Sequence, residues 1–330
     1  MDWNGILSNA LRSAIGLETI IYGLAAIGLN LHFGYAGLLN FGQAAFVAVG
    51  AYGIAVSVTT FGLPFRVGVL VGIGGAVVLA LLLGIPTLRL RADYLAIATI
   101  AAAEIVRLVF RSVSLREYTG GSDGLQGFDN GFYGLNPLPE GTYGFWVFRF
   151  SERLTWILLV GWMLVALCCL VTFLLMRSPW GRVLKAIRED EDAVRSLGKN
   201  VYLYKMQALV LGGVVGAFSG FIFALGRAAV QPDLYGTEFT FFAYTILLLG
   251  GAARVFGPIV GAAIFWVVLS VTDNLLNQLV RYGYMPEAIM SGTQVGQVRF
   301  MLVGLALMLL MIFRPQGIFG DKREIAINAR

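Results

Sequence analysis

Residues 154–176 read LTWILLVGWMLVALCCLVTFLLM and contain no charged side chain. An α-helix rises 1.5 Å per residue, so about 20 apolar residues cross a hydrocarbon core that is about 30 Å thick. A helix at the surface of a soluble protein carries a polar face, which this stretch lacks. The stretch therefore predicts a membrane-spanning helix.

Eight further stretches have a similar length and apolar character. They are residues 13–31, 41–60, 67–85, 94–111, 207–225, 239–253, 257–276 and 299–313. We therefore predict an all-α integral membrane protein, a bundle of about nine (8–10) transmembrane helices in a single domain over residues 1–330.

The composition supports the same class. The chain is 58% apolar and 13% charged, with a mean hydropathy of +0.78, whereas soluble domains have about 45–50% apolar and about 25% charged residues. The net charge of +5 is too small to indicate nucleic-acid binding. A single histidine excludes a His-rich metal site, and the adjacent Cys168 and Cys169 do not form a disulfide framework. The N-terminus lacks the pattern of a cleaved signal peptide, so we expect the first span to be retained.

Basic residues predict the orientation. Residues 177–206 hold seven of them, whereas the longer segment 112–153 holds three. Because cytoplasmic loops are enriched in Lys and Arg, residues 177–206 and the tail 314–330 should be cytoplasmic. Residues 112–153, 226–238 and 277–298 should then lie outside, as should the N-terminus. Glycines within 32–46 could break that segment or make it re-entrant, which would change the number of spans.

Small residues repeat along two of the predicted spans. Gly212, Gly216 and Gly220 recur every four residues, and so do glycines and alanines across residues 68–84. Such faces let membrane helices approach closely. They serve either packing within one bundle or sliding of helices during transport.

The segment 177–206 is expected to form one or two short amphipathic helices against the membrane. Ser178-Pro179 is a typical N-cap with proline at the first helical position. The acidic run 189–192 suits the start of a second helix, and Gly198 suits its end. The surface is either an ordinary solvated loop or a docking site for a cytoplasmic partner.

Ionisable and polar side chains within predicted spans are candidate functional groups, because burying them in a membrane is costly. Glu104 and Arg107 lie three residues apart and share a helix face. They form either a mutual ion pair or part of a polar translocation path. Asn40, Gln43 and Thr99 are further candidates that either join helices or contact a ligand.

Five motifs resemble those of one transporter family. Asp192-Ala193-Val194-x-x-x-Gly198 resembles the EAA-x-x-x-G coupling loop of ABC importer permeases. Residues 37–46 (GLLNFGQAAF), 92–99 (ADYLAIAT), 119–125 (TGGSDGL) and 314–320 (RPQGIFG) resemble motifs of the LivM branch of branched-chain amino-acid permeases. The resemblance extends from about Ile20 to Gly320. Asn40 stands where serine is common in the family and Gln43 where histidine is common, and the external loop is long.

The resemblance implies a permease subunit of an ATP-driven ABC importer that moves branched-chain or related apolar amino acids inward by alternating access. It implies four partners: a homologous permease, two ATPase subunits and an extracytoplasmic amino-acid-binding protein. No Gly-x-x-x-x-Gly-Lys-[Ser/Thr] phosphate loop is present. The chain is therefore expected not to be an enzyme and to bind no cofactor, with ATP and Mg on the partner subunits. The residues expected to couple to the ATPase are Arg188, Glu189, Asp190, Glu191, Asp192, Ala193, Leu197 and Gly198.

The expected location is the plasma (inner) membrane, in contact with lipid and with a cytoplasmic C-terminus. Two alternatives stay open. A permease of the same family could carry urea or short amides, and a stand-alone secondary transporter would work without an ATPase.

Overall fold

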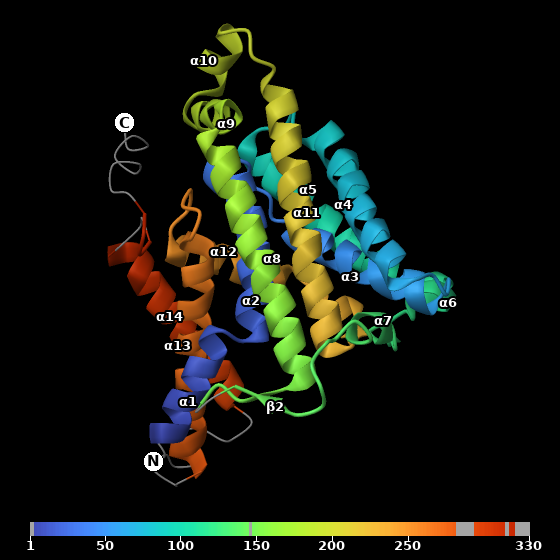
Figure 1. Ribbon diagram of the computed structural model, residues 1–330. Helices are drawn as coiled ribbons and strands as arrows, with labels where there is room; N and C mark the ends of the chain where they lie inside the picture. The colour runs from blue at the N-terminus through green and yellow to red at the C-terminus, as the bar shows by residue number, and fades with distance from the viewer. Residues whose placement is uncertain (1–2, 145–146, 282–293, 314–316, 321–330) are drawn as a thin grey trace.

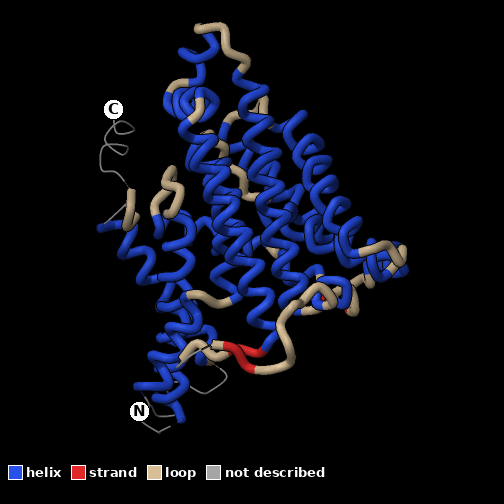
Figure 2. The backbone as a smooth tube through the Cα atoms, viewed as in Figure 1, coloured by secondary structure: helices blue, strands red, loops and turns tan. Residues whose placement is uncertain are grey.

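The computed structural model describes residues 3–144, 147–281, 294–313 and 317–320, and its architecture is a bundle of helices with short strands at one end (Figures 1 and 2). The long helices are α2 (Leu17–Leu29), α3 (Gln43–Thr59), α4 (Phe65–Thr87), α5 (Ala92–Arg111), α8 (Glu152–Arg177), α11 (Val201–Arg227), α12 (Thr237–Gly250), α13 (Gly257–Arg281) and α14 (Val295–Phe313). Each of the nine predicted stretches overlaps one of them. The predicted all-α membrane fold is confirmed.

Among the described residues, five helical segments are long and apolar enough to cross a membrane: Trp3–Tyr35, which comprises α1 (Trp3–Ala14), α2 and η1 (Asn30–Tyr35), and the helices α4, α8, α11 and α13. The shorter apolar helices α3 and α12 have 17 and 14 residues. At 1.5 Å per residue, α12 is about 21 Å long and shorter than the hydrocarbon core. It ends at Gly250, and the following Gly251 has a φ of 104°, which an L side chain rarely adopts. The predicted stretch 239–253 is therefore shifted towards the N-terminus.

The first predicted span needs a correction. The stretch 13–31 was expected to be one helix, but α1 (Trp3–Ala14) ends within it, and Gly16 is extended before α2 begins. α1 packs along α13 at the end of the bundle where the N-terminus lies (Figure 1). Residues 30–35 continue α2 as a π-helix, η1 (Asn30–Tyr35), and residues 36–42 are not helical. The segment 32–46 is thus broken, which was one of the two expected outcomes.

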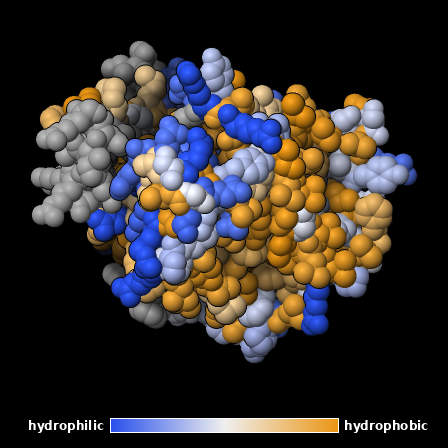
Figure 3. All heavy atoms as spheres, turned by 90° about the horizontal axis from the view of Figure 1, so that it is seen from above, coloured by the Kyte–Doolittle hydropathy of each residue, from blue (hydrophilic) through white to orange (hydrophobic). Residues whose placement is uncertain are grey.

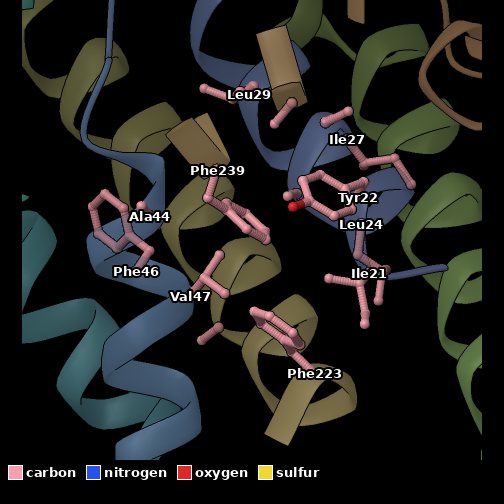
Figure 4. Close-up of a cluster of buried hydrophobic side chains, with 14 of the residues drawn as sticks. Ile21, Tyr22, Leu24, Ile27, Leu29, Ala44, Phe46, Val47, Phe223 and Phe239 are labelled. Carbon is pink, nitrogen blue, oxygen red and sulfur yellow. The ribbon is translucent and has the colours of Figure 1, made fainter. Parts of the chain in front are cut away.

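The core is centred on α2. Eleven of the 13 residues of α2 are buried, so this helix is enclosed on all sides, and it packs against α3, α11, α12 and α13. Figure 4 shows Ile21, Tyr22 and Leu24 of α2 facing Val47 of α3, Phe223 of α11 and Phe239 of α12.

The outer helices expose apolar side chains instead of burying them. Leu70 and Leu82 on α4, Ile97 on α5 and Met163 on α8 are all more than 60% exposed. A soluble monomer rarely shows such large apolar surfaces. In this chain they are suited to contact lipid or another membrane subunit.

The segment between α5 and α8 covers one end of the bundle. It holds η2 (Val113–Leu115), α6 (Arg116–Thr119), β1 (Leu125–Gln126), α7 (Asn130–Tyr133), β2 (Thr142–Tyr143) and β3 (Phe150–Ser151). β1 pairs antiparallel with β4 (Ala229–Val230), which follows α11 and precedes η3 (Pro232–Tyr235). Phe128, which belongs to this segment, is fully buried. Most of the expected external loop 277–298 and most of the expected tail 314–330 lie outside the part of the chain that the structure describes.

Candidate functional site

The turn after α8 is tight because its residues permit close backbone approach. The Ser178 hydroxyl accepts a hydrogen bond from Gly181 N at 3.4 Å, and Pro179 occupies the first position of α9 (Pro179–Glu189). A Cβ atom on Gly181 would lie 2.5 Å from the carbonyl oxygen of Leu175. The predicted cap is confirmed, and the turn places α9 across the end of the bundle.

A second short helix, α10 (Glu191–Ser196), follows directly. Asp190 caps it, because its Oδ1 accepts a hydrogen bond from Ala193 N at 2.9 Å. Ile187 of α9, Val194 of α10 and Val201 of α11 form a small buried cluster. One or two amphipathic helices were predicted here and two are present, and this cluster fixes them to the start of α11.

Most of the predicted coupling residues are exposed on this surface. Arg195 bridges Glu191 at 2.9 Å and Asp192 at 2.8 Å, and Lys205 of α11 also pairs with Glu191. Exposed pairs of this kind contribute about 0–1 kcal/mol. Leu197 is 79% exposed, and Gly198 follows with a φ of 75°. Seen from this end, hydrophilic side chains form a band flanked by hydrophobic ones (Figure 3). The other exposed members are Glu189, Asp190 and Ala193.

Arg188 differs from the other predicted coupling residues because it faces the bundle. Its guanidinium donates a hydrogen bond to the carbonyl oxygen of Gly34 in η1. A Cβ atom on Gly37, which has a φ of 69°, would lie 3.2 Å from Cγ of Arg188. Lys185 also lies over the ring of Tyr35, at 5.9 Å from its centroid. These contacts connect α9 to the π-helical segment.

The π-helical segment is in turn bonded to three other elements. Asn30 donates to the carbonyl oxygen of Arg254 and accepts from Ala253 N, both at 2.8 Å, in the loop between α12 and α13. His32 Nε2 lies 3.1 Å from the carbonyl oxygen of Leu209 on α11. Since a carbonyl only accepts, Nε2 carries the proton and Nδ1 accepts from Asn40 Nδ2 at 3.0 Å. A π-helical turn within an α-helix often marks a functional site.

The polar candidates Asn40, Gln43 and Thr99 are fully buried. Asn40 Oδ1 accepts from Gly42 N at 2.8 Å, and Thr99 Oγ1 accepts from Phe41 N at 3.0 Å. Gln43 Nε2 donates to Ala25 and Gly212 carbonyl oxygens, while its Oε1 has no partner among the described residues. All three side chains hold the non-helical turn and the start of α3 against neighbouring helices.

The predicted glycine face of α11 lies against α2 and α3. A Cβ atom on Gly212 would lie 2.2 Å from Nε2 of His32, and one on Gly216 would lie 2.7 Å from Nε2 of Gln43. One on Gly220 would lie 2.0 Å from the carbonyl oxygen of Val47. Only glycine permits these separations, which supports the packing interpretation.

Glu104 and Arg107 form an ion pair with two contacts, at 2.6 Å and 2.9 Å. Arg107 also contacts Asp233 of η3 at 2.5 Å, and Arg111 reaches the same carboxylate at 3.3 Å. Sequence reasoning missed Asp233, which is separated from Arg107 by 126 positions. These side chains lie at a cavity in the half of the bundle nearer α6 than α9.

No group of three or more His, Cys, Asp or Glu side chains that could hold a metal ion occurs within the part of the chain that the structure describes.

Comparison with known proteins identifies the family. The profile of the family described as "Branched-chain amino acid transport system / permease component" matches residues 12–313. The high-affinity branched-chain amino acid transport system permease protein LivM of Escherichia coli (strain K12) is 33% identical over 92% of this chain and 69% of that protein. A probable LivM of Methanocaldococcus jannaschii is 27% identical over 96% of this chain and 95% of that protein. The permease protein LivH of Escherichia coli is 26% identical over 91% of each.

The apolar helices, the broken segment after α2 and the paired short helices after α8 define a multi-pass membrane permease. Permease subunits of this class are not themselves enzymes. The chain belongs to the family of permease components of branched-chain amino acid ABC transport systems.

Proposed function

We propose that this chain imports branched-chain or related apolar amino acids through the plasma membrane as one of two permease subunits in an ABC transporter. Its partners would be a homologous permease, two ATPase subunits that bind ATP and Mg, and an extracytoplasmic amino-acid-binding protein. The similarity to both LivM and LivH of Escherichia coli supports a pair of unlike permeases. Residues 1–330 would act as a single permease domain.

The connection between α9 and η1 is the observation that carries the coupling mechanism. The exposed surface formed by α9 and α10 would contact an ATPase subunit on the cytoplasmic side. When ATP draws the ATPases together, α9 would move, and Arg188 would pull on the carbonyl oxygen of Gly34. Asn30 and His32 would then transmit the displacement to α11 and to the α12–α13 loop.

The test is a double substitution of Asp192 and Gly198 on the exposed side of this surface. Gly198 has open space around its Cβ position, but its φ of 75° disfavours most L side chains, so it is replaced by asparagine, which tolerates this region. We expect the double variant to insert into the membrane and to retain its fold. We expect the transporter that contains it to show no uptake. Normal uptake by this variant would overturn the coupling assignment.

Uptake of labelled leucine with competing solutes tests the substrate. A stretch of 109 residues in this chain is also 31% identical to the autoinducer 2 import system permease protein LsrC of Salmonella typhimurium. Permeases that resemble this chain are therefore named for different substrates. Competition by valine and isoleucine supports the proposal, whereas competition by urea or short amides favours a permease of the same family that carries those solutes. Uptake that follows an ion gradient after loss of the ATPases would favour a secondary transporter.

A further inference from the structure

A cavity of about 490 Å³ lies where the C-terminal half of α5, the start of α12 and α2 meet. Its volume falls within the range of about 300–1,000 Å³ that is typical of small-molecule sites. Glu104 and Arg107 line it from α5, Thr237 and Glu238 from the first turn of α12, and Tyr22 from α2. Because α5 leads into α6, the cavity belongs to the half of the bundle remote from α9 and α10 (Figure 1).

The charged side of the cavity is unbalanced towards negative charge. Three carboxylates line it, those of Glu104, Asp233 and Glu238, against the single guanidinium of Arg107. Arg107 is bonded to Glu104 and Asp233, and Arg111, which is outside the lining, also contacts Asp233. Glu238 is exposed and has no ion-pair partner among the described residues. The cavity therefore favours a ligand that brings a positive group.

The facing side of the cavity is aromatic. Tyr22 stacks on Phe239 with ring centroids 4.5 Å apart, and Phe242 lies 6.3 Å from Tyr22. Both phenylalanines also line the cavity. This wall can receive an apolar side chain of a ligand by removing it from water.

Tyr22 adds a polar group to the aromatic wall. It lines the cavity and is only 9% exposed, and its hydroxyl has no hydrogen-bond partner among the described residues. The hydroxyl is not one of the buried side-chain atoms that lack a partner, so it is open to the cavity and available to a molecule that enters it.

We propose that this cavity is a transit site for a zwitterionic amino acid with an apolar side chain. The ammonium group lies by Glu238 and Glu104, the carboxylate takes the place of Asp233 on Arg107, and the apolar side chain contacts Tyr22, Phe239 and Phe242. The proposal rests on the proposed function, because it assigns a site to the substrate class of the transporter. Binding here should be weak, since the ligand must replace an existing ion pair and then leave again.

Protection of a cysteine at the rim of the cavity tests occupancy directly. Thr237→Cys is introduced with Cys168→Ala and Cys169→Ala, which remove the two native thiols. The complete transporter in lipid nanodiscs, without ATP, is treated with a small charged thiosulfonate reagent. We expect leucine, isoleucine and valine to slow modification about tenfold at about ten times their dissociation constant. Lysine, glutamate, 4-methylpentanoate and isopentylamine, which each carry a different charge pattern, should protect far less.

Two matched variants show whether protection depends on the assigned groups. Adding Glu238→Gln should remove most of the protection by leucine, whereas Glu140→Gln, an exposed carboxylate in the α7–β2 segment, should leave it unchanged. A cysteine at Ser122, which is exposed and does not line the cavity, should not be protected. An unchanged midpoint of thermal unfolding shows that the Glu238→Gln variant is intact, and protection is expressed relative to each variant's own rate without ligand.

The proposal is overturned if leucine fails to protect Thr237→Cys, if every solute protects equally, or if Glu238→Gln leaves protection intact. Uptake by the wild-type transporter separates this failure from that of the proposed function. If leucine is imported but does not protect, only the site assignment is wrong. If the complete transporter imports no apolar amino acid, the proposed function itself is wrong.

Discussion

Arg188 on α9 donates a hydrogen bond to the carbonyl oxygen of Gly34, which belongs to the π-helical end of the first span. The two residues are 154 positions apart, and the bond connects the surface helices to the interior. Arg188 is the only one of the predicted coupling residues that points into the bundle. Substituting it therefore tests the transmission of motion while leaving the exposed surface that would contact the ATPase unchanged.

Replacing Arg188 with alanine is expected to reduce uptake by about 10- to 100-fold. A hydrogen bond from a charged donor contributes about 1.5–3 kcal/mol, and each 1.4 kcal/mol corresponds to a factor of ten. ATP hydrolysis and copurification of the ATPases should persist, because the exposed faces of α9 and α10 are unchanged. The measurement is labelled amino-acid uptake alongside ATPase activity in the reconstituted complex.

Arg182→Ala is the matched comparison, since Arg182 lies exposed on the same helix, within the surface proposed to contact the ATPase. Any loss of uptake in this variant should come with weaker copurification of the ATPases, which Arg188→Ala should not show. Equal losses in the two variants would mean that α9 acts through its overall charge and not through the bond to Gly34.

Replacing Asn40 with alanine is expected to destabilise the protein strongly. Asn40 accepts from Gly42 N and donates to His32 Nδ1, and the site is fully buried. Removing the side chain leaves two buried polar groups without partners, at about 1–3 kcal/mol each. The midpoint of thermal unfolding in detergent measures the loss.

Asn40→Ser should recover part of this loss, because a serine hydroxyl can still accept from Gly42 N. Asn136→Ala provides a comparison at a half-exposed site, where Asn136 Oδ1 accepts from Leu138 N at 3.0 Å. Water can replace that bond, so a small effect is expected. A similar loss at positions 40 and 136 would argue against a role for burial.

Replacing Gly220 with alanine is expected to separate α11 from α3. The added Cβ would overlap the carbonyl oxygen of Val47, and backbone atoms cannot move aside as a side chain does. Overpacking of this kind costs about 1–3 kcal/mol. Thermal unfolding of the purified protein should show a lower midpoint than for the wild type.

The control is Gly74→Ala on α4, where an added Cβ meets no atom within 4 Å. This variant should unfold at the same temperature as the wild type or slightly higher, since alanine favours helix. A stable Gly220→Ala protein would show that α11 and α3 can move apart, as the sliding interpretation requires.

The sequence predicts the helices well because each depends on a local apolar run. It also predicts the cap at Ser178 and the start of a second helix within the acidic run 189–192, because both depend on a few neighbouring residues. It does not predict that Asp190 is the cap of that helix. It does not predict α1 as a separate helix, because Gly16 interrupts a stretch that remains apolar on average. The π-helical segment was equally unpredictable, since its bonds run from Asn30 and His32 to residues far along the chain.

The candidate site also combines contacts that the sequence predicts with contacts that depend on the tertiary fold. Glu104 and Arg107 could be paired from their spacing on one helix, whereas the contact of Arg107 with Asp233 depends on the tertiary fold. Tyr22 offers no signal in the sequence, because it stands in an apolar stretch that resembles any other span. Its place at the cavity follows only from how α2, α5 and α12 pack.

The orientation predicted from basic residues can be checked by labelling single cysteines in a background without Cys168 and Cys169. Ser196 at the end of α10 and Ser122 in the segment after α6 are both exposed, and α10 and α6 lie towards opposite ends of the bundle (Figure 1). Because Lys and Arg are enriched in cytoplasmic loops, a membrane-impermeant maleimide should label Ser122→Cys in intact cells. It should label Ser196→Cys only after permeabilisation. Labelling of Ser196→Cys in intact cells would reverse the orientation and place α9 and α10 where no ATPase could reach them.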